Sequence, residues 1–85
     1  MCTMIVEKAE ISGSAKGQQG WFTVNEANVA YDHPFHAPLE YALNIDFVNE
    51  AQGLSARVAV ELTADSARQL VKAINAALAR GEAQT

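Results

Sequence analysis

The chain has 85 residues, of which 49% are hydrophobic and 19% are charged, and its formal net charge is −4. This is the composition of one globular domain, and it argues against a disordered tail, a collagen-like chain or a disulfide scaffold. A single cysteine cannot form a disulfide within the chain. The few Lys and Arg residues are too scattered to neutralise a row of phosphates, so we expect no nucleic-acid partner.

The apolar residues do not gather into a membrane-spanning or secretory segment. A membrane helix needs a run of about 18 apolar residues, and no such run is present. The short apolar run at residues 4–6 meets Glu7 too soon for a signal peptide. We therefore expect a cytoplasmic protein with no membrane partner.

The first part of the chain predicts two strands. Residues 3–12 are rich in β-branched side chains and end at Gly13, which indicates a strand. Residues 13–20 contain turn residues without an apolar anchor, and they predict a mobile loop. Residues 21–31 hold two apolar stretches around a polar centre, so a second strand is expected, bulged or broken near Asn25.

The clearest periodicity follows in the middle of the chain. In residues 41–47 the large apolar side chains occupy odd positions, and in residues 54–62 they occupy even positions. A period of two is typical of half-buried antiparallel strands. Residues 49–53 between them predict a hairpin connection.

The charges in these two strands suggest a register. One register places Asp46 directly opposite Arg57, and the alternative places Glu40 opposite Glu61. Opposite charges stabilise a cross-strand pair, whereas like charges destabilise it. We therefore predict the first register, with a tight loop over residues 50–53.

The last part of the chain predicts a helix over residues 63–80. Thr63 suits the N-cap, Asp65 the first turn, Arg80 the last turn and Gly81 the stop. One apolar stripe recurs at helical spacing and consists of Ala67, Leu70, Val71, Ile74, Ala77 and Leu78.

Together these elements predict one α+β domain over residues 1–81, followed by a polar tail over residues 82–85. The order ββββα indicates a four-stranded, mainly antiparallel sheet with one C-terminal helix packed on its apolar face. One helix is too narrow to cover four strands, and a chain of this length buries only about 60% of its surface. The surplus apolar surface predicts a homo-oligomer, with a two-fold dimer as the first expectation.

The loop around His33 and His36 holds the densest cluster of chemically versatile side chains. We expect this loop, together with a subunit interface, to bind a small ligand or a partner. The alternative is that both rings pack on Phe35 or hydrogen-bond to backbone groups. The predicted ligand-binding residues are Tyr31, Asp32, His33, Phe35, His36 and Glu40.

A transition-metal site is the second hypothesis for this loop. Cys2, His33 and His36 would offer one thiolate and two imidazoles, which suit Zn²⁺ or, beside thioethers, Cu(I). Their spacing matches none of the strong zinc patterns. No cofactor is therefore firmly implied, and zinc or copper remains the alternative.

Cys2 also permits a third hypothesis, a small enzyme. Removal of Met1 would leave an N-terminal cysteine whose amine and thiol both titrate near neutral pH. With a histidine as base, such a thiol can act as a nucleophile. The competing interpretation is a small buried hydrophobic residue at the start of a strand, so no catalytic residue is assigned.

A polar patch is expected on the open face of the sheet. It combines Asp46 and Arg57 with Asn44 and Glu61. A solvated surface with one weak ion pair explains such a patch more simply than a binding site does.

Several segments resemble a family of small bacterial proteins of unknown function. They are residues 1–3, residues 20–22, residues 31–40 and residues 43–47, read as Met-Cys-Thr, Gly-Trp-Phe, Tyr-Asp-His-Pro-Phe-His-Ala-Pro-Leu-Glu and Leu-Asn-Ile-Asp-Phe. The resemblance covers most of the chain and implies no activity. It directs attention to the same N-terminal cysteine and histidine loop.

Overall fold

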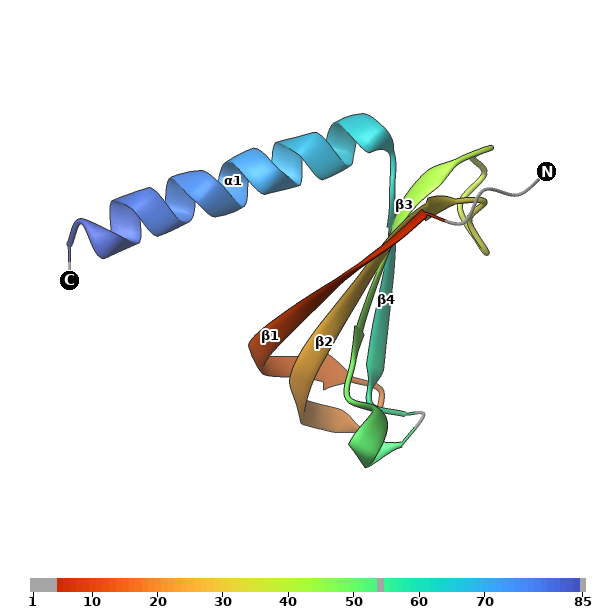
Figure 1. Cartoon of the computed structure of the whole chain (residues 1–85), viewed down its shortest axis with the longest axis horizontal. Helices are drawn as coiled ribbons and strands as arrows, with labels where there is room; N and C mark the ends of the chain where they lie inside the picture. The colour runs from red at the N-terminus through yellow and green to blue at the C-terminus, as the bar shows by residue number, and fades with distance from the viewer. Residues whose placement is uncertain (1–4, 54, 85) are drawn as a thin grey trace.

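The computed structural model describes residues 5–53 and 55–84 and consists of one sheet followed by one helix (Figure 1). The strands form a single antiparallel sheet in the order β1-β2-β3-β4. The predicted α+β class and the order ββββα are confirmed. The elements are β1 (Ile5–Gly17), β2 (Gly20–Asp32), β3 (Ala42–Val48), the 3₁₀ turn η1 (Glu50–Gln52), β4 (Arg57–Leu62) and α1 (Ala64–Glu82).

Alternation along the strands gives the sheet an apolar face and a polar face. On the apolar face, Val29 of β2 pairs with Ile45 of β3, which pairs with Val60 of β4. The next row on the same face is formed by Tyr31, Leu43 and Leu62. The polar face carries two rows across the same strands, formed by Asn28, Asp46 and Ala59 and by Ala30, Asn44 and Glu61.

The register of β3 and β4 differs from the predicted one by two residues. Arg57 pairs with Val48, and Asp46 pairs with Ala59. Arg57 still reaches Asp46 diagonally, with its Nε and Nη2 atoms 3.0 and 2.7 Å from Oδ1 of the carboxylate. The predicted register is therefore wrong, although the predicted ion pair forms.

Asn49 explains this shift because it draws more residues into the connection. Its side chain is 7% exposed, and its Nδ2 atom donates to the carbonyl of Thr23 at 2.9 Å. Its Oδ1 atom accepts from the N–H of Ala51 at 3.2 Å, which caps η1. The Asn49 N–H donates to the carbonyl of Ala56 at 3.1 Å and closes the connection. The loop is thus longer than the predicted tight turn, and Arg57 starts β4 opposite Val48.

The segment predicted as a mobile loop over residues 13–20 is mostly strand. β1 continues to Gly17, and Gln18 and Gln19 form the turn to β2. Gly20 has a φ of 115°, which a glycine adopts easily and other residues rarely do. Backbone pairing here does not require apolar side chains, so hydropathy alone did not indicate the strand.

The predicted irregularity near Asn25 lies at the expected level of the sheet, but on the other strand. Pairing of β1 with β2 shifts between Glu10 and Gly13, opposite Asn25. The extra residue therefore belongs to β1. Because a bulge bends its strand, the far end of the β1–β2 hairpin curves toward the start of β4 (Figure 1).

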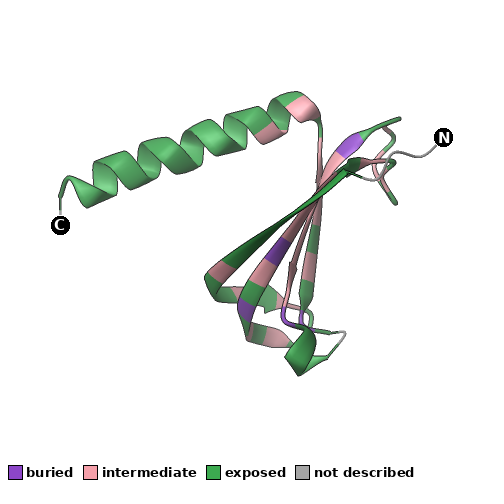
Figure 2. Cartoon of the chain, viewed as in Figure 1, coloured by how far each residue is buried: buried purple, intermediate pink, exposed green. Residues whose placement is uncertain are grey.

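The buried core is small and lies entirely within the sheet and its connection (Figure 2). Among the described residues, no large side chain is fully buried. The buried apolar residues are Val24, Ala27, Ala42 and Ala56. A core of one valine and three alanines leaves the large apolar side chains of the chain at or near the surface.

The placement of α1 differs from the expected packing across the sheet. The helix contacts β3 and β4 only near its N-terminal end and then projects away from the sheet (Figures 1 and 2). None of its residues is buried. Leu70, Val71, Ile74 and Leu78 are 42–57% exposed, so the predicted stripe exists, but none of residues 5–53 and 55–84 covers it.

The link between β4 and α1 gives the physical reason. Thr63 is the only residue between Leu62 and Ala64, and its φ and ψ of −68° and 159° set the direction of the helix. Its side chain accepts from the N–H of Ser66 at 3.1 Å, which holds the N-cap. Links between strands and helices usually take two to six residues, so this one is too short to turn α1 back along the sheet. In the described ranges no helix is both long and apolar enough to cross a membrane.

Candidate functional site

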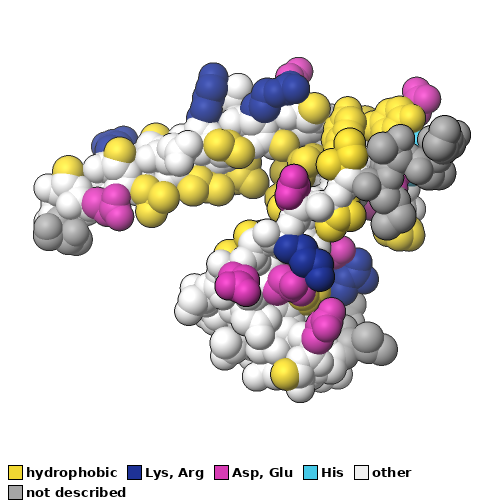
Figure 3. Space-filling model, in the orientation of Figure 1, with side chains coloured by type: hydrophobic (Ala, Val, Ile, Leu, Met, Phe, Trp, Pro, Cys, Tyr) yellow, Lys and Arg dark blue, Asp and Glu magenta, His cyan; other side chains and the backbone are white. Residues whose placement is uncertain are grey.

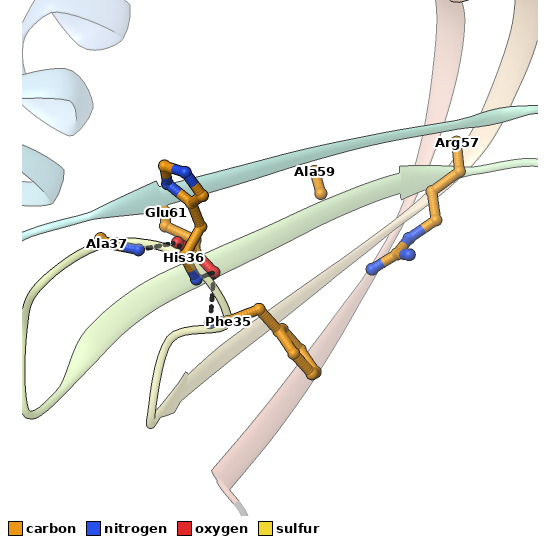
Figure 4. Close-up of a pocket in the computed structure, with 6 residues that line it drawn as sticks. All are labelled: Phe35, His36, Ala37, Arg57, Ala59 and Glu61. Carbon is orange, nitrogen blue, oxygen red and sulfur yellow. Dashed lines mark hydrogen bonds between the residues drawn. The ribbon is translucent and has the colours of Figure 1, made fainter.

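The loop between β2 and β3 is fixed by one carboxylate from β4 (Figure 4). The backbone N–H groups of Phe35, His36 and Ala37 donate to Glu61 at 2.6, 3.1 and 2.8 Å. These three groups have no strand partner, and the carboxylate satisfies all of them. The loop is therefore attached to β4 at a defined position.

These contacts change the acidity of Glu61. Hydrogen bonds from the backbone of Ala37 and Phe35 lower the pKa of the Glu61 carboxyl below its ordinary value of 4.5. Partial removal from water opposes this shift, while the N–H and the charge of His36 add to it. The carboxylate form is thus favoured in the folded protein.

We expect the contribution of Glu61 to stability to depend on pH. Because its pKa is lowered by folding, the stabilisation is complete above pH 4.5 and is lost as the pH falls through the folded-state pKa. Glu61→Gln should therefore unfold at a lower urea concentration than the wild type at neutral pH, and this difference should shrink below pH 4.5.

The matched control for this measurement is Glu40→Gln, since Glu40 lies in the same loop with an exposed side chain. Its urea midpoint should follow that of the wild type across the same pH range. A Glu61→Gln difference that stays constant with pH would show that the carboxylate does not hold the loop.

His33 is held at the base of the loop. Its Nδ1 atom lies 2.8 Å from the carbonyl oxygen of Glu40. A carbonyl only accepts, so Nδ1 carries the proton in the neutral ring and Nε2 keeps a free lone pair. The ring stacks on Tyr41 with centroids 4.9 Å apart, and Tyr41 stacks on Tyr31 at 5.8 Å. The side chain of Asp32 accepts from the N–H of His33 at 2.7 Å, and this bond also holds the start of the loop in place.

A shallow polar hollow of about 540 Å³ lies beside the loop on the polar face of the sheet (Figure 4). Phe35 is 96% exposed at its rim. The Arg57 guanidinium lies at the other end and is engaged by Asp46. The lining residues are Phe35, His36, Ala37, Arg57, Ala59 and Glu61.

The structure therefore distributes the predicted ligand-binding residues over three places. Phe35 and His36 line the polar hollow. Asp32, His33 and Glu40 take part in the hydrogen bonds at the base of the loop. Tyr31 lines a groove on the apolar face instead.

That groove is an open apolar hollow of about 550 Å³ between α1 and the sheet. Figure 3 shows hydrophobic side chains along the side of the helix that faces the sheet. The floor and walls consist of Val29, Tyr31, Leu43 and Ile45 from the sheet and Ala64, Ala67, Arg68, Leu70, Val71 and Ile74 from the helix. The groove was not predicted from the sequence because the helix was expected to fill it.

The predicted metal site cannot be assembled from the described residues. Within residues 5–53 and 55–84, no group of three or more His, Cys, Asp or Glu side chains is arranged to hold a metal ion. Cys2 lies outside the described residues, so the metal set with His33 and His36 and the Cys2 nucleophile both stay predictions. The hydrogen bond of His33 to a carbonyl is of the kind that orients metal-binding imidazoles.

The role of Glu61 was missed by the sequence analysis. Residues 35–37 lie between two prolines, in a segment whose N–H groups have no strand partner. Phe35 and His36 are exposed, so water could satisfy their N–H groups and the sequence did not require an acceptor within the protein. It did not identify the acceptor, because Glu61 is 24 to 26 residues away.

Comparisons with known proteins identify the family of this chain. A protein-family model described as a family of unknown function, DUF6295, matches residues 1–85. No curated protein and no solved structure matches the chain. The resemblance to a family of unknown function is confirmed, and it supplies no activity that could be transferred to this chain.

Proposed function

Since this chain belongs to DUF6295, a family of unknown function, its role has to be argued from its geometry, and we propose that it is a homodimeric binding module. Two copies cover the apolar surfaces that each leaves exposed. The loop over residues 33–36 presents a site for a small ligand or partner on the polar face of each sheet.

The observation that carries the proposal is the surface exposed by a single chain. One copy exposes 6734 Å², whereas a compact monomer of this mass exposes about 4,900 Å². The excess of about 1,800 Å² is roughly twice what one partner buries in a standard interface. The radius of gyration, 14.4 Å, likewise exceeds the value of about 12 Å for a compact chain of this length.

The exposed surface also has the chemistry of an interface. Leu70, Val71, Ile74 and Leu78 are all at least 42% exposed on one helix. Leu70, Val71 and Ile74 line the groove on the apolar side of the sheet, where Tyr31 is 41% exposed. Contiguous apolar surface of this extent is rare on soluble monomers and is typical of association sites.

The loop supports the ligand-binding part of the proposal. It is held in one conformation by Glu61 and by the hydrogen bond between His33 and Glu40. A preformed surface avoids the entropy cost of ordering upon binding. The exposed ring of Phe35 offers a ligand apolar contacts, and the nearby imidazole of His36 offers it hydrogen bonds.

Thermal unfolding at several chain concentrations tests the association. A protein that unfolds as it dissociates has a midpoint that depends on concentration. With an unfolding enthalpy of about 0.7 kcal/mol per residue, each tenfold dilution should lower the midpoint of a dimer by about 4 °C. A midpoint that does not change over a hundredfold dilution into the low micromolar range contradicts the proposal.

Phe35→Ala is the matched control for this experiment. The side chain is 96% exposed and lies on the polar face, so its removal should leave both the midpoint and its concentration dependence unchanged. A loss of concentration dependence in this variant would place the loop in the subunit contact instead of in a separate ligand site.

A further inference from the structure

We propose that the groove between α1 and the sheet is the seat for α1 of a second copy, so that two chains exchange their helices about a two-fold axis. This inference rests on the proposed dimer and names the element that each copy receives. It assigns the partner of the groove as the C-terminal helix of an identical chain.

The helix has an apolar surface wide enough for such a seat. At about 100° per residue, its apolar positions cover roughly half of its circumference. A helix that packs against a single surface needs only about 100°. A half-apolar helix can therefore contact two surfaces at once, and the groove offers two, a sheet and a second helix. The apolar side chains in this arc are Ala64, Ala67, Leu70, Val71, Ala73, Ile74, Ala77 and Leu78, and Ser66 is a polar member near one edge of the arc.

The groove has matching chemistry. Val29, Leu43 and Ile45 form an aliphatic floor on the sheet. Leu70 and Ile74 of the same chain form the opposite wall. If α1 of a second chain lay between the sheet and α1 of the first chain, it would cover both the floor of the groove and the apolar stripe of the first chain's helix.

The connection at Thr63 prevents a chain from filling its own groove. One residue separates Leu62 from Ala64, and Thr63 is fixed by its capping hydrogen bonds to Ser66 and Ala67. Short connections that keep an element away from its own chain favour exchange of that element between copies. Thr63 therefore keeps α1 away from the sheet of its own chain and leaves the groove accessible to the helix of a second chain.

The other surfaces of the sheet are less suited to a second copy. The outer strand β1 carries Glu7, Lys8 and Glu10, and charged side chains on an edge strand oppose edge-to-edge pairing. The polar face carries the Asp46–Arg57 ion pair, which would lose water in an interface. The groove is lined by one charged side chain, Arg68, and by nine uncharged ones. The Arg68 side chain is 71% exposed and paired with Asp65, so its charge lies at the water-facing rim.

Reciprocal exchange also closes the assembly. Each chain supplies one helix and one groove, so a two-fold dimer leaves neither unfilled. The excess surface of about 1,800 Å² per chain is in the range that obligate dimers bury.

Isotope-filtered NMR on a mixed dimer tests the seat directly. A chain with ¹³C-labelled Ile, Leu and Val methyl groups is refolded together with an unlabelled chain, and only contacts between the two chains are recorded. We expect intermolecular contacts from the methyl groups of Leu70 and Ile74 to those of Leu43 and Ile45. Light scattering on the same sample measures the mass of the assembly.

The outcomes separate this inference from the proposed dimer. A dimer whose intermolecular contacts join only the two helices, or only the β1 edges, overturns the groove as the seat and leaves the dimer standing. A monomer whose Ile74 contacts Ile45 within one chain overturns both, since the helix would then fill its own groove.

Discussion

Ile74→Asp is expected to convert the proposed dimer into monomers. Ile74 lies in the middle of the apolar stripe and is 50% exposed in a single chain, so the charge costs the isolated chain little. In the dimer the same carboxylate would be buried in an apolar groove, at a cost of about 3 kcal/mol or more. This corresponds to at least about a hundredfold weaker association, and the two-fold symmetry applies the cost twice. Light scattering across a dilution series measures the change.

Gln69→Asp provides the matched control because it introduces the same charge one helical face away. Gln69 is exposed and does not line the groove. We expect its dissociation constant to stay close to that of the wild type. If Gln69→Asp dissociates the dimer as strongly as Ile74→Asp does, then net charge and not the apolar stripe controls association.

Asn49→Ala is expected to lower the stability of the fold by about 2 kcal/mol. The amide is 7% exposed, and its loss would leave the carbonyl of Thr23 and the N–H of Ala51 without their partners. An intramolecular hydrogen bond typically contributes about 0.5–1.5 kcal/mol, and this substitution removes two of them. For a chain of this length, 2 kcal/mol corresponds to a thermal midpoint lower by about 8–16 °C.

Asn25→Ala is the comparison for this effect. Asn25 is exposed and makes one long contact, 3.5 Å, to the Oδ1 atom of Asn49. Its replacement should change the stability by no more than about 0.5 kcal/mol. Both variants are measured by urea unfolding at one chain concentration, and equal losses would show that Asn49 has no special role in the connection.

Much of the fold could be predicted because it depends on local patterns. The alternation in β3 and β4 indicates which residues share a face, and the structure agrees. Thr63 and the apolar stripe predict α1, although the helix continues through Gly81 to Glu82. The register could not be predicted, because it depends on the hydrogen bond of Asn49 to Thr23, a residue 26 positions earlier.

The direction of α1 could not be predicted for a related reason. It depends on the backbone conformation of Thr63, and hydropathy describes only which face of a helix is apolar. The apolar stripe of α1 is compatible with packing on the sheet of the same chain or on a partner chain. The sequence therefore predicted surplus apolar surface, while the structure shows where it lies.

The sequence directed attention to the loop, and the role of the loop as a binding site stays a prediction. The loop with His33 and His36 is held by hydrogen bonds to Glu40 and Glu61. The residue types in the loop were the reason for predicting a binding site there. Its internal order depends on Glu61, which the sequence places far away on another strand. The residues of the loop also divide between two faces of the sheet, as Tyr31 and Phe35 show. A linear segment does not reveal such a division.

The two faces of the sheet have separate roles in the proposed dimer. In the proposed dimer the apolar face and α1 would join two chains, and the polar face with Phe35 and Arg57 would stay exposed to solvent. A two-fold dimer of this kind presents two copies of the loop. A partner with two matching sites would then gain affinity from engaging both.

Sedimentation equilibrium of the wild-type chain at micromolar concentration distinguishes a dimer from a monomer. A chain of 9.1 kDa whose exposed helix is covered by an identical copy should show twice that mass. A single species with the mass of one chain would contradict the account, because the apolar groove and the stripe of α1 would then face water without a partner.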